Sequence, residues 1–517
     1  MGGFEKLHEV RFPPPGKTPA DDTRAVIKFY RLAESFPQQV LKEAKRVSKF
    51  PGDPGKRLDL RRKFIFTCDP KSARDYDDAI SLETDRRGNR VLGVHIADVS
   101  HFVRPGGALD REARRRSTSV YFCDRVLPML PEELSNGACS LVPGEDRFAF
   151  SVFMTFDRDG RMVKRSFAKS IIRSSARFTY EQAMTVICGG TSPDVGKRAA
   201  QTLRRVSDLA QQLRSRRFRD GALDLEIPDV EVLLDRAGEM AALELRPYDE
   251  SHQMIEECMV AANEAVAAEL WSKGIKIPAR LHEPPDEEKM LTLRAEMRGL
   301  GVRMGDISKA AVFASFLQSI KRNPLYPTIA MMILRSMKKA VYDSKTIGHF
   351  GLAKRYYAHF TSPIRRYPDL MLHRQLSRYL AGENARMPPD MLERQTRYAT
   401  EREEIATEAE RALIEIKKFR YLEGLLSSRS GIEFDAVISK CMPFGCFVEI
   451  PELAVSGLVH VSSLARGFVR FNESDQSLSL SKSRSWRAGD KMRVRVAGVD
   501  FRERKIDFEP VLSRFKR

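Results

Sequence analysis

The sequence predicts an α+β protein in which a domain of mixed sheet and helices is followed by a small all-β barrel. Apolar β-type runs flank an acidic loop at residues 64–83, and helical patterns then dominate as far as residue 426. From residue 431 the chain returns to short apolar strands separated by turns. A chain of 517 residues with 42% hydrophobic side chains is long enough for two to four domains with their own cores.

The charge balance points to a polyanionic partner. Lysine and arginine number 88 against 70 aspartates and glutamates, which gives a net charge of +18. Basic side chains supply salt-sensitive, sequence-independent affinity, so phosphate chains fit this composition best. The N-terminus lacks a signal-peptide core and no apolar run approaches about 20 residues, so we expect no membrane segment. Of seven scattered cysteines only Cys441 and Cys446 are close in sequence, so we expect reduced thiols in a cytoplasmic protein.

Residues 1–55 are expected to form an N-terminal segment and linker. A proline-rich stretch at 11–19 is followed by one or two helices over 25–47, broken near Phe36 and Pro37. Glycine and proline among basic residues at 49–63 then indicate a surface strap that leads into the next domain.

The most informative stretch runs from residue 64 to 83 and reads FIFTCDPKSARDYDDAISLE. It places four carboxylates, Asp69, Asp75, Asp77 and Asp78, in a loop between two expected strands. Like charges about 4 Å apart repel by roughly 4 kcal/mol at a surface-like dielectric. A fold relieves this repulsion by raising a pKa, by turning the side chains into water or by binding cations. All-oxygen clusters suit Mg²⁺ or Mn²⁺, and the alternative is a solvated acidic turn.

A second strand is expected directly after this loop. A turn at 86–89 separates strands near 80–82 and 91–96, and the second strand ends in HIADVSH at 95–101. Asp98 either joins the acidic cluster from this neighbouring strand or caps the loop that follows. We interpret His95 and His101 as structural histidines with satisfied hydrogen bonds.

Five motifs in order resemble the RNB catalytic domain of the RNase II/RNase R family. The acidic run followed by GVHIADVSHFV is the first, and a chance match of all five is implausible. The other four are SVYFCDRVLPMLPEELSNGACSL at 119–141, RFTYEQA at 177–183, IEECMVAAN at 255–263 and HFTSPIRRYPDLMLHR at 359–374.

The resemblance implies a 3′→5′ exoribonuclease that hydrolyses single-stranded RNA processively to nucleoside 5′-monophosphates in RNA degradation and processing. Two-metal catalysis with Mg²⁺, or Mn²⁺ in its place, is part of that implication. Asp69, Asp75, Asp77 and Asp78 match the family's metal carboxylates, and Asp77 matches the acid essential to cleavage. The rival is a non-catalytic RNA-binding protein that keeps the fold, against which the four retained acids argue. A nuclease specialised for one class of RNA stays open.

Two arginines follow Pro363, which is expected to break regular structure ahead of a helix at 370–380. Arginine forms a planar fork to phosphate and stays charged, so it can brace charge that develops at phosphorus. Arg365 matches the family's catalytic arginine. Arg366 either contacts RNA or pairs with Asp369.

Further matches supply expected RNA contacts. Tyr121 and Tyr180 match tyrosines of the family's RNA path, where aromatic rings stack on bases. Glu256 and Asn263 share one face of a helix expected at 251–273, where a carboxylate and an amide could bond ribose hydroxyls. Glu256 matches such a position in the family. The sequence departs from the family at Leu225, near which members often carry a stacking aromatic.

The C-terminal stretches GIEFDAVISKCMPFGCFVEI and SGLVHVSSL resemble an S1-type OB-fold that binds RNA. Phe444 and His460 match its RNA-facing positions, and Phe447 either joins them or lies in the core. Lys440, Arg466 and Arg470 are candidates to meet phosphates. A long charged helix at 399–426 is expected to precede this domain.

We therefore expect an N-terminal segment at 1–55, an RNB domain at 56–428, an S1-type domain at 429–511 and a basic tail at 512–517. The first segment is too short for the cold-shock domains typical of the family, so the chain is either a short member or a truncated one. Single-stranded RNA is the expected partner of a monomer with no nucleotide cofactor and no membrane attachment.

Overall fold

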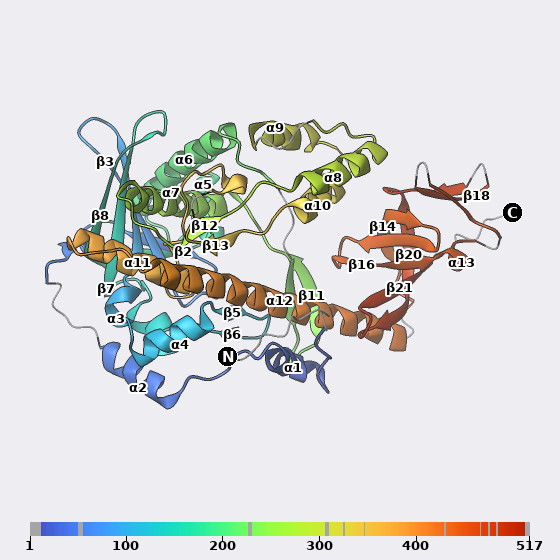
Figure 1. Cartoon of the computed structure of the whole chain (residues 1–517), viewed down its shortest axis with the longest axis horizontal. Coiled ribbons are helices and arrows are strands. Elements are labelled where there is room, and N and C mark those ends of the chain that lie inside the picture. Colours follow the sequence, from blue (N-terminus) through green and yellow to red (C-terminus); the bar gives the residue numbers. More distant parts are fainter. Residues whose placement is uncertain are drawn as a thin grey trace.

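A computed structural model gives the structure of the chain (Figure 1). It describes residues 12–49, 55–225, 230–305, 310–323, 326–345, 347–428, 431–465, 467–473, 476–481 and 484–511. A large sheet lies at one end of the molecule and a small barrel at the other. The helix α12 (Pro389–Ser427) runs along the molecule between them.

The large sheet has seven strands in the order β1-β8-β7-β4-β3-β2-β9. It is antiparallel except at its two edges, where β1 pairs with β8 and β9 pairs with β2 in parallel. The mixed sheet predicted from the sequence is therefore confirmed. The strands are β1 (Leu58–Asp59), β2 (Phe66–Asp69), β3 (Asp78–Thr84), β4 (Arg90–Ala97), β7 (Asp146–Phe156), β8 (Met162–Arg173) and β9 (Ala176–Thr179).

Helices cover both faces of this sheet because its strands alternate apolar side chains between two cores. Phe66 and Ile80 point into the core under one set of helices, whereas Ile65 and Ala79 point into the opposite core. The first core packs against α5 (Tyr180–Ile187), α6 (Lys197–Arg219) and α7 (Glu250–Ser272). The second packs against α2 (Gln38–Val47), α3 (Val99–Phe102), α4 (Ala108–Arg116) and α11 (Tyr367–Leu380).

The remaining elements lie between the sheet and the barrel. The predicted break near Phe36 and Pro37 is confirmed, because α1 (Asp22–Phe29) ends before α2 begins. The long helix α12 begins ten residues before the predicted position, with a proline in its first turn. The other long helices are α8 (Glu287–Gly299), α9 (Ala310–Ile320) and α10 (Tyr326–Ser336). Three pairs of short strands are β5 (Val120–Tyr121) with β6 (Val126–Leu127), β10 (Val230–Leu234) with β11 (Met240–Leu245), and β12 (Ala279–Leu281) with β13 (Val341–Asp343). Short helices lie at Pro19–Asp21, Glu133–Ala138 and Phe350–Leu352.

The C-terminal part is all β, as predicted. Five strands close a barrel in the order β14-β15-β16-β21-β20, and a three-stranded sheet β17-β18-β19 adjoins it. The elements are β14 (Phe434–Met442), β15 (Gly445–Ile450), β16 (Val455–His460), α13 (Val461–Leu464), β17 (Arg470–Asn472), β18 (Ser477–Ser481), β19 (Arg484–Trp486), β20 (Lys491–Asp500) and β21 (Lys505–Pro510). No helix in the described ranges combines the length and apolar character needed to cross a bilayer.

Asp98 does not join the acidic cluster. Its carboxylate is fully buried, lies 2.6 Å from Arg57 and 3.4 Å from Lys169, and accepts a hydrogen bond from Ser100.

The interpretation of His95 as a structural histidine is confirmed, since its buried ring is hydrogen-bonded to the hydroxyls of Ser81 and Ser151. Burial lowers the pKa of His95 to about 3, so the ring is neutral.

Asp98 provides a test of how the sheet is held to the linker. Burial alone would raise its pKa, but Lys169 and Arg57 bring it down to about 2. The folded-state pKa lies below the unfolded one, so this stabilisation is present above about pH 4 and is lost as the pH falls toward 2. Asp98→Asn leaves two cations without their partner and should lower the free energy of unfolding at pH 7 by roughly 3–5 kcal/mol. Urea unfolding at pH 7 and pH 3 measures this loss, which should shrink at the lower pH.

The matched control is Glu145→Gln, which removes an exposed partner of Arg147 and should change stability little. Equal urea midpoints for Asp98→Asn and the unaltered chain at pH 7 would contradict the stabilising role of the buried Asp98 carboxylate.

Candidate active site

The four acids lie in a loop that the sheet holds at both ends. Asp69 is the last residue of β2 and Asp78 the first of β3, and the two strands pair in antiparallel register. Between them the backbone is fixed from outside the loop: Ser140 Oγ accepts the N–H of Tyr76 at 3.0 Å, and the Asp77 carbonyl accepts the N–H of Ala97 at 2.9 Å. The carboxylates are therefore presented on a rigid support.

Asp77 has the most specific surroundings of the four. Its side chain is 7% exposed, its Oδ1 accepts the N–H of Ile364 at 2.9 Å, and its Oδ2 lies 4.0 Å from Arg365 Nε. Burial raises the pKa of Asp77 well above its ordinary value, although Arg365 and the Ile364 N–H oppose this. The segment that carries Arg365 is thus attached to the acidic loop through Asp77.

The other three acids are half-buried, which excludes a freely solvated turn. Burial and the neighbouring charge of Asp78 raise the pKa of Asp69 to about 8. Burial likewise raises the pKa of Asp78 to about 6, against the opposing effect of Arg365, and also raises that of Asp75. Ionising all four acids at neutral pH is therefore costly unless positive charge is added.

The donor chemistry of the loop fits a divalent cation. Asp69 Oδ2 is buried and has no hydrogen-bond partner among the residues that the structure describes, so one carboxylate oxygen is left to accept an ion or a proton. Hard cations such as Mg²⁺ prefer carboxylate oxygens. Within the described residues, however, no three acidic, histidine or cysteine side chains are already arranged around one ion position. The donor set therefore fits, and the side chains must turn to complete it.

A large cavity opens in front of the loop. It encloses about 1340 Å³, more than a typical small-molecule site. Asp75, Tyr121, Tyr180 and Glu256 all line it, so the structure brings these four predicted residues together. Asp69, Asp77, Asp78 and Arg365 are not among its lining residues. Ile364, which is bonded to Asp77, does line it.

The two tyrosines enter the cavity from different elements. Tyr121 lies on β5, is 41% exposed and donates its backbone N–H to Glu410 of α12 at 2.6 Å. Tyr180 begins α5, and its ring stacks on His252 with a centroid distance of 3.8 Å. Both rings can therefore offer a face or an edge to a flat ligand.

Glu256 and Asn263 have different roles although they share a helix. Arg217 donates to Glu256 at 3.2 Å and the Tyr248 hydroxyl donates to it as well, while the carboxylate remains 35% exposed in the cavity. Asn263 is buried, donates to the Tyr357 hydroxyl at 3.1 Å and accepts the N–H of Phe360 at 2.8 Å. The expectation that Asn263 is free to contact a ligand was wrong, because it joins α7 to the segment ahead of the arginines.

The two arginines also differ in exposure and in their partners. Arg365 is 43% exposed and donates to Ser362 Oγ at 3.2 Å. Arg366 is only 16% exposed, donates to Asp369 Oδ1 at 2.8 Å and does not line the cavity. The pairing alternative therefore describes Arg366 in this structure, and Arg365 is the arginine beside the acids.

Several cavity residues were not predicted from the sequence. Arg246 and Tyr248 follow β11 and His252 lies in the first turn of α7; all three line the cavity. Leu225, already noted at the position of the family's aromatic, lines it too. Of these, His252 had a detectable pattern, because it precedes Glu256 by four residues on one helix face. The others are brought in by tertiary packing.

The barrel forms a second candidate surface. Phe444 is 43% exposed and Phe447 37% exposed, with ring centroids 6.1 Å apart. Gly445 pairs with His460, which places that exposed histidine on the same edge. The core interpretation of Phe447 was therefore wrong. Lys440 and Arg470, the other candidates of this domain, are exposed. Arg466 and the basic tail at 512–517 lie outside the described residues.

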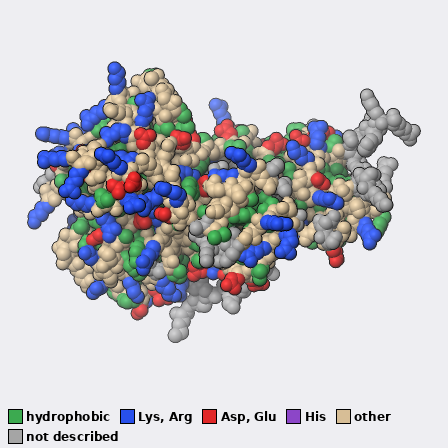
Figure 2. Space-filling model, turned by 90° about the horizontal axis from the view of Figure 1, so that it is seen from above, with side chains coloured by type: hydrophobic (Ala, Val, Ile, Leu, Met, Phe, Trp, Pro, Cys, Tyr) green, Lys and Arg blue, Asp and Glu red, His purple; other side chains and the backbone are tan. Residues whose placement is uncertain are grey.

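Basic side chains are widely distributed over the surface of the molecule. Figure 2 shows many lysines and arginines on the face that it presents, most densely over the end that carries the large sheet. This distribution agrees with the net charge of +18 and with a polyanionic partner.

Comparisons with known proteins extend these observations. The family model of the RNB domain matches residues 57–382, and that of the S1 RNA binding domain matches residues 428–509. Ribonuclease R of Thermotoga maritima is 38% identical over 96% of this chain and 74% of its own length. Ribonuclease R of Aquifex aeolicus is 38% identical over 98% of this chain and 72% of its own length.

A solved structure agrees with these matches. Mycoplasma genitalium RNase R in complex with ribose methylated single-stranded RNA matches with a TM-score of 0.87 and 28% identity, covering 96% of this chain and 78% of that chain. The resemblance and the two-part fold expected from the motifs are thereby confirmed.

The acidic loop makes a direct prediction about cations. Mn²⁺ or Mg²⁺ should raise the melting temperature, because an ion that binds only the folded loop stabilises it by about 2.7 kcal/mol at a hundred times its dissociation constant. Asp69→Asn should abolish this shift. Asp85→Asn, in the exposed turn after β3, should keep it. Thermal unfolding with EDTA, Mg²⁺ and Mn²⁺ measures the effect, and an equal shift in Asp69→Asn would show that the ions bind elsewhere.

Proposed function

This chain belongs to the ribonuclease R family of RNB-domain exoribonucleases, and from that premise we propose that it releases nucleoside 5′-monophosphates processively from the 3′ end of single-stranded RNA with two Mg²⁺ ions. The observation that carries the proposal is the acidic quartet of Asp69, Asp75, Asp77 and Asp78 beside Arg365 at the edge of the large cavity. Mn²⁺ is an alternative ion. The proposed protein is a cytoplasmic monomer without a nucleotide cofactor.

The cavity supports a path for the 3′ end of a single strand. Tyr121 and the Tyr180–His252 stack present aromatic rings to unpaired bases, which stack on them without regard to sequence. Glu256 offers a carboxylate that can accept from a ribose 2′-hydroxyl, held in place by Arg217 and Tyr248. Leu225 packs in the same cavity but cannot stack as an aromatic would.

The chemistry takes place where the acids meet Arg365. Bound Mg²⁺ would activate water and neutralise charge on the scissile phosphate, with Asp69, Asp75, Asp77 and Asp78 as the residues that hold it. Arg365, anchored by Ser362 and 4.0 Å from Asp77, can turn its exposed guanidinium toward the phosphate and brace the charge that grows there. Asp77 is kept in position by the N–H of Ile364.

Processivity is proposed to come from a second binding site for the same RNA strand. Phe444, Phe447 and His460 form an exposed edge on the barrel that suits bases and phosphates. We assign residues 56–428 to the RNB domain and 429–511 to the S1-type domain, with α12 as the connection between them. Two attachment points on one chain would keep the RNA bound while its 3′ end is shortened.

The test uses a 5′-labelled single-stranded RNA of about 30 nucleotides, longer than several OB-fold sites. With Mg²⁺ the chain should release 5′-monophosphates and leave one short labelled product. EDTA should stop the reaction, and Asp77→Asn should still bind RNA without cutting it. Arg365→Ala should lower kcat by roughly 10²–10³-fold, the usual loss on removing one transition-state donor.

Asp85→Asn is the matched control and should cut RNA as the unaltered chain does. Intact RNA with both Mg²⁺ and Mn²⁺ would overturn the proposal, and internal fragments would indicate an endonuclease.

A further inference from the structure

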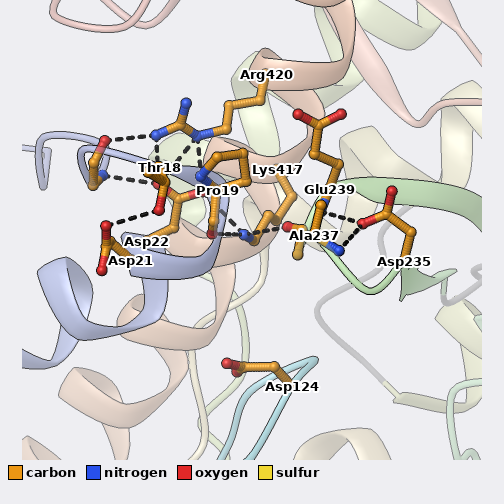
Figure 3. Close-up of polar contacts among 12 residues, drawn as sticks. Thr18, Pro19, Asp21, Asp22, Asp124, Asp235, Ala237, Glu239, Lys417 and Arg420 are labelled. Carbon is orange, nitrogen blue, oxygen red and sulfur yellow. Dashed lines mark hydrogen bonds and ion pairs between the residues drawn. The ribbon is translucent and has the colours of Figure 1, made fainter.

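A buried ionic cluster lies away from the acids, where the N-terminal segment meets α12 (Figure 3). Its members are Asp22, Lys417 and Arg420, here called the Asp22 cluster. The side chains of Asp22 and Lys417 are 0% and 1% exposed. Lys417 Nζ donates to Asp22 Oδ2 at 3.0 Å, to the Gly238 carbonyl at 2.7 Å and to the Pro19 carbonyl. All three protons of its ammonium group therefore have an acceptor.

Arg420 completes the cluster. Its Nε and Nη2 each donate to the Asp22 carboxylate at 2.9 Å, and Nη2 also donates to the Gly16 carbonyl at 2.6 Å. The backbone N–H of Gly16 returns a hydrogen bond to Asp22 Oδ1 at 2.8 Å. Asp22 is thus held by two cations and by its own segment, which fixes the orientation of its carboxylate.

The cluster joins three segments that are far apart in the sequence: residues 16–22, α12 and the turn between β10 and β11. Gly238 in that turn has φ +81°, and a Cβ there would lie 3.1 Å from the Cα of Ala20. Asp235 closes the turn by accepting the N–H groups of Ala237 and Glu239 at 2.8 and 2.9 Å (Figure 3). The tip of the hairpin is therefore rigid and in close contact with the N-terminal segment.

The β10–β11 hairpin reaches the RNA cavity from its other end. Glu231 on β10 lines the cavity, and so do Arg246 and Tyr248, which directly follow β11. Tyr248 donates to Glu256, the residue proposed to face the ribose. A shift of this hairpin would therefore move these three lining residues and release one hydrogen bond to Glu256.

The second hairpin of the cavity rim depends on the same segment. Tyr121 on β5 donates its N–H to Glu410 of α12, two helical turns before Lys417. Its neighbours form one apolar core with α1 and α12, made of Val26, Ile27, Leu32, Val120, Phe122, Leu127, Ala406, Ala409, Leu413 and Ile416. Both hairpins are thus attached to α12 and to the N-terminal segment.

Burying charge is an inefficient way to add stability, since a well-packed apolar cluster often does as well. A fully bonded ionic cluster does, however, tolerate only one relative position of its segments. The acidic loop does not share these contacts, because Ser140, Ala97 and Ile364 hold it. A change in the cluster therefore reaches the cavity rim while these contacts of the acidic loop stay in place.

We propose that Asp22, Lys417 and Arg420 are positioning residues that fix the β5–β6 and β10–β11 hairpins at the rim of the RNA cavity, and so set the length at which a shortened RNA is released. This inference rests on the proposed RNA path. Loosening the cluster displaces Tyr121 and Tyr248, which weakens the hold on the last bases. RNA then leaves earlier and with more nucleotides, while cleavage of bound RNA continues.

The experiment compares Asp22→Asn and Lys417→Met with the unaltered chain on the 5′-labelled RNA. KM should rise by roughly tenfold, the loss of about one stacked base, with kcat unchanged within about twofold. The final labelled product should be longer by at least one nucleotide. Hydrogen exchange of residues 120–127 and 230–248 should become faster while that of β2 and β3 stays the same.

Asp21→Asn is the matched control, because Asp21 is the neighbouring residue. Its exposed side chain accepts from Thr18 and lies 4.0 Å from Arg24, outside the cluster. It should change none of these quantities. If the cluster variants fail to fold, Gly238→Ala is the alternative variant, since it keeps all the charges and strains the backbone of the turn and its contacts with Ala20 and Pro19. It should lengthen the product in the same direction.

Lower stability of the cluster variants with unchanged KM and product length would overturn the inference and leave the cluster a purely structural role. If the unaltered chain releases no monophosphate, the proposed function fails. In that case hydrogen exchange alone tests whether the cluster positions the hairpins. Exchange that is unchanged in both hairpins of the cluster variants would overturn the positioning role.

Discussion

The structure depends on one electrostatic constraint, the crowding of four carboxylates into the loop between β2 and β3. Burial raises the pKa of Asp69 to about 8 and that of Asp78 to about 6, so the loop resists full ionisation at neutral pH. The rigid sheet prevents the acids from moving away into water. Arg365 and the N–H of Ile364 offset part of the charge, while Asp69 Oδ2 has no partner among the described residues. Protonation or bound cations can offset the rest, and Mg²⁺ would also supply the chemistry of the proposed hydrolysis.

In the proposed function, the rest of the molecule brings a phosphate chain to that loop and keeps its end in place. The cavity walls come from α5, α7 and two hairpins, and α12 connects these hairpins to the barrel. The Asp22 cluster lies at the crossing of α12, the N-terminal segment and the β10–β11 turn. In the proposed mechanism the acids determine whether the chain can cut, and the rim determines when a shortened strand is released. The Asp22 cluster contacts the rim and not the acidic loop, so substitutions in it test the second role.

Local patterns in the sequence predicted the elements that depend on neighbouring residues. Apolar β-type runs and the turn at 86–89 identified the strands around Ile80 and Val94. The spacing of the aspartates with the motif around Arg365 identified the acidic centre. Long-range choice of partners was not predictable in the same way. Asn263 and Glu256 share a helix face by spacing, yet Phe360 and Tyr357 bind only the first. Arg366 pairs with Asp369, Phe447 is exposed, and Asp22 finds Lys417 nearly four hundred residues away. Each outcome depends on tertiary packing that short stretches of sequence do not encode.

The central claim is that the acidic loop becomes stable and competent by holding two cations against a bound strand. The most direct measurement is anomalous diffraction at the manganese edge from crystals of the chain with Mn²⁺ and a ribose-methylated single-stranded RNA. We expect two anomalous peaks roughly 4 Å apart, within coordination distance of the four aspartates, with the 3′-terminal phosphodiester beside them. RNA in the cavity with no manganese at these aspartates, or with manganese only at other sites, would contradict the claim.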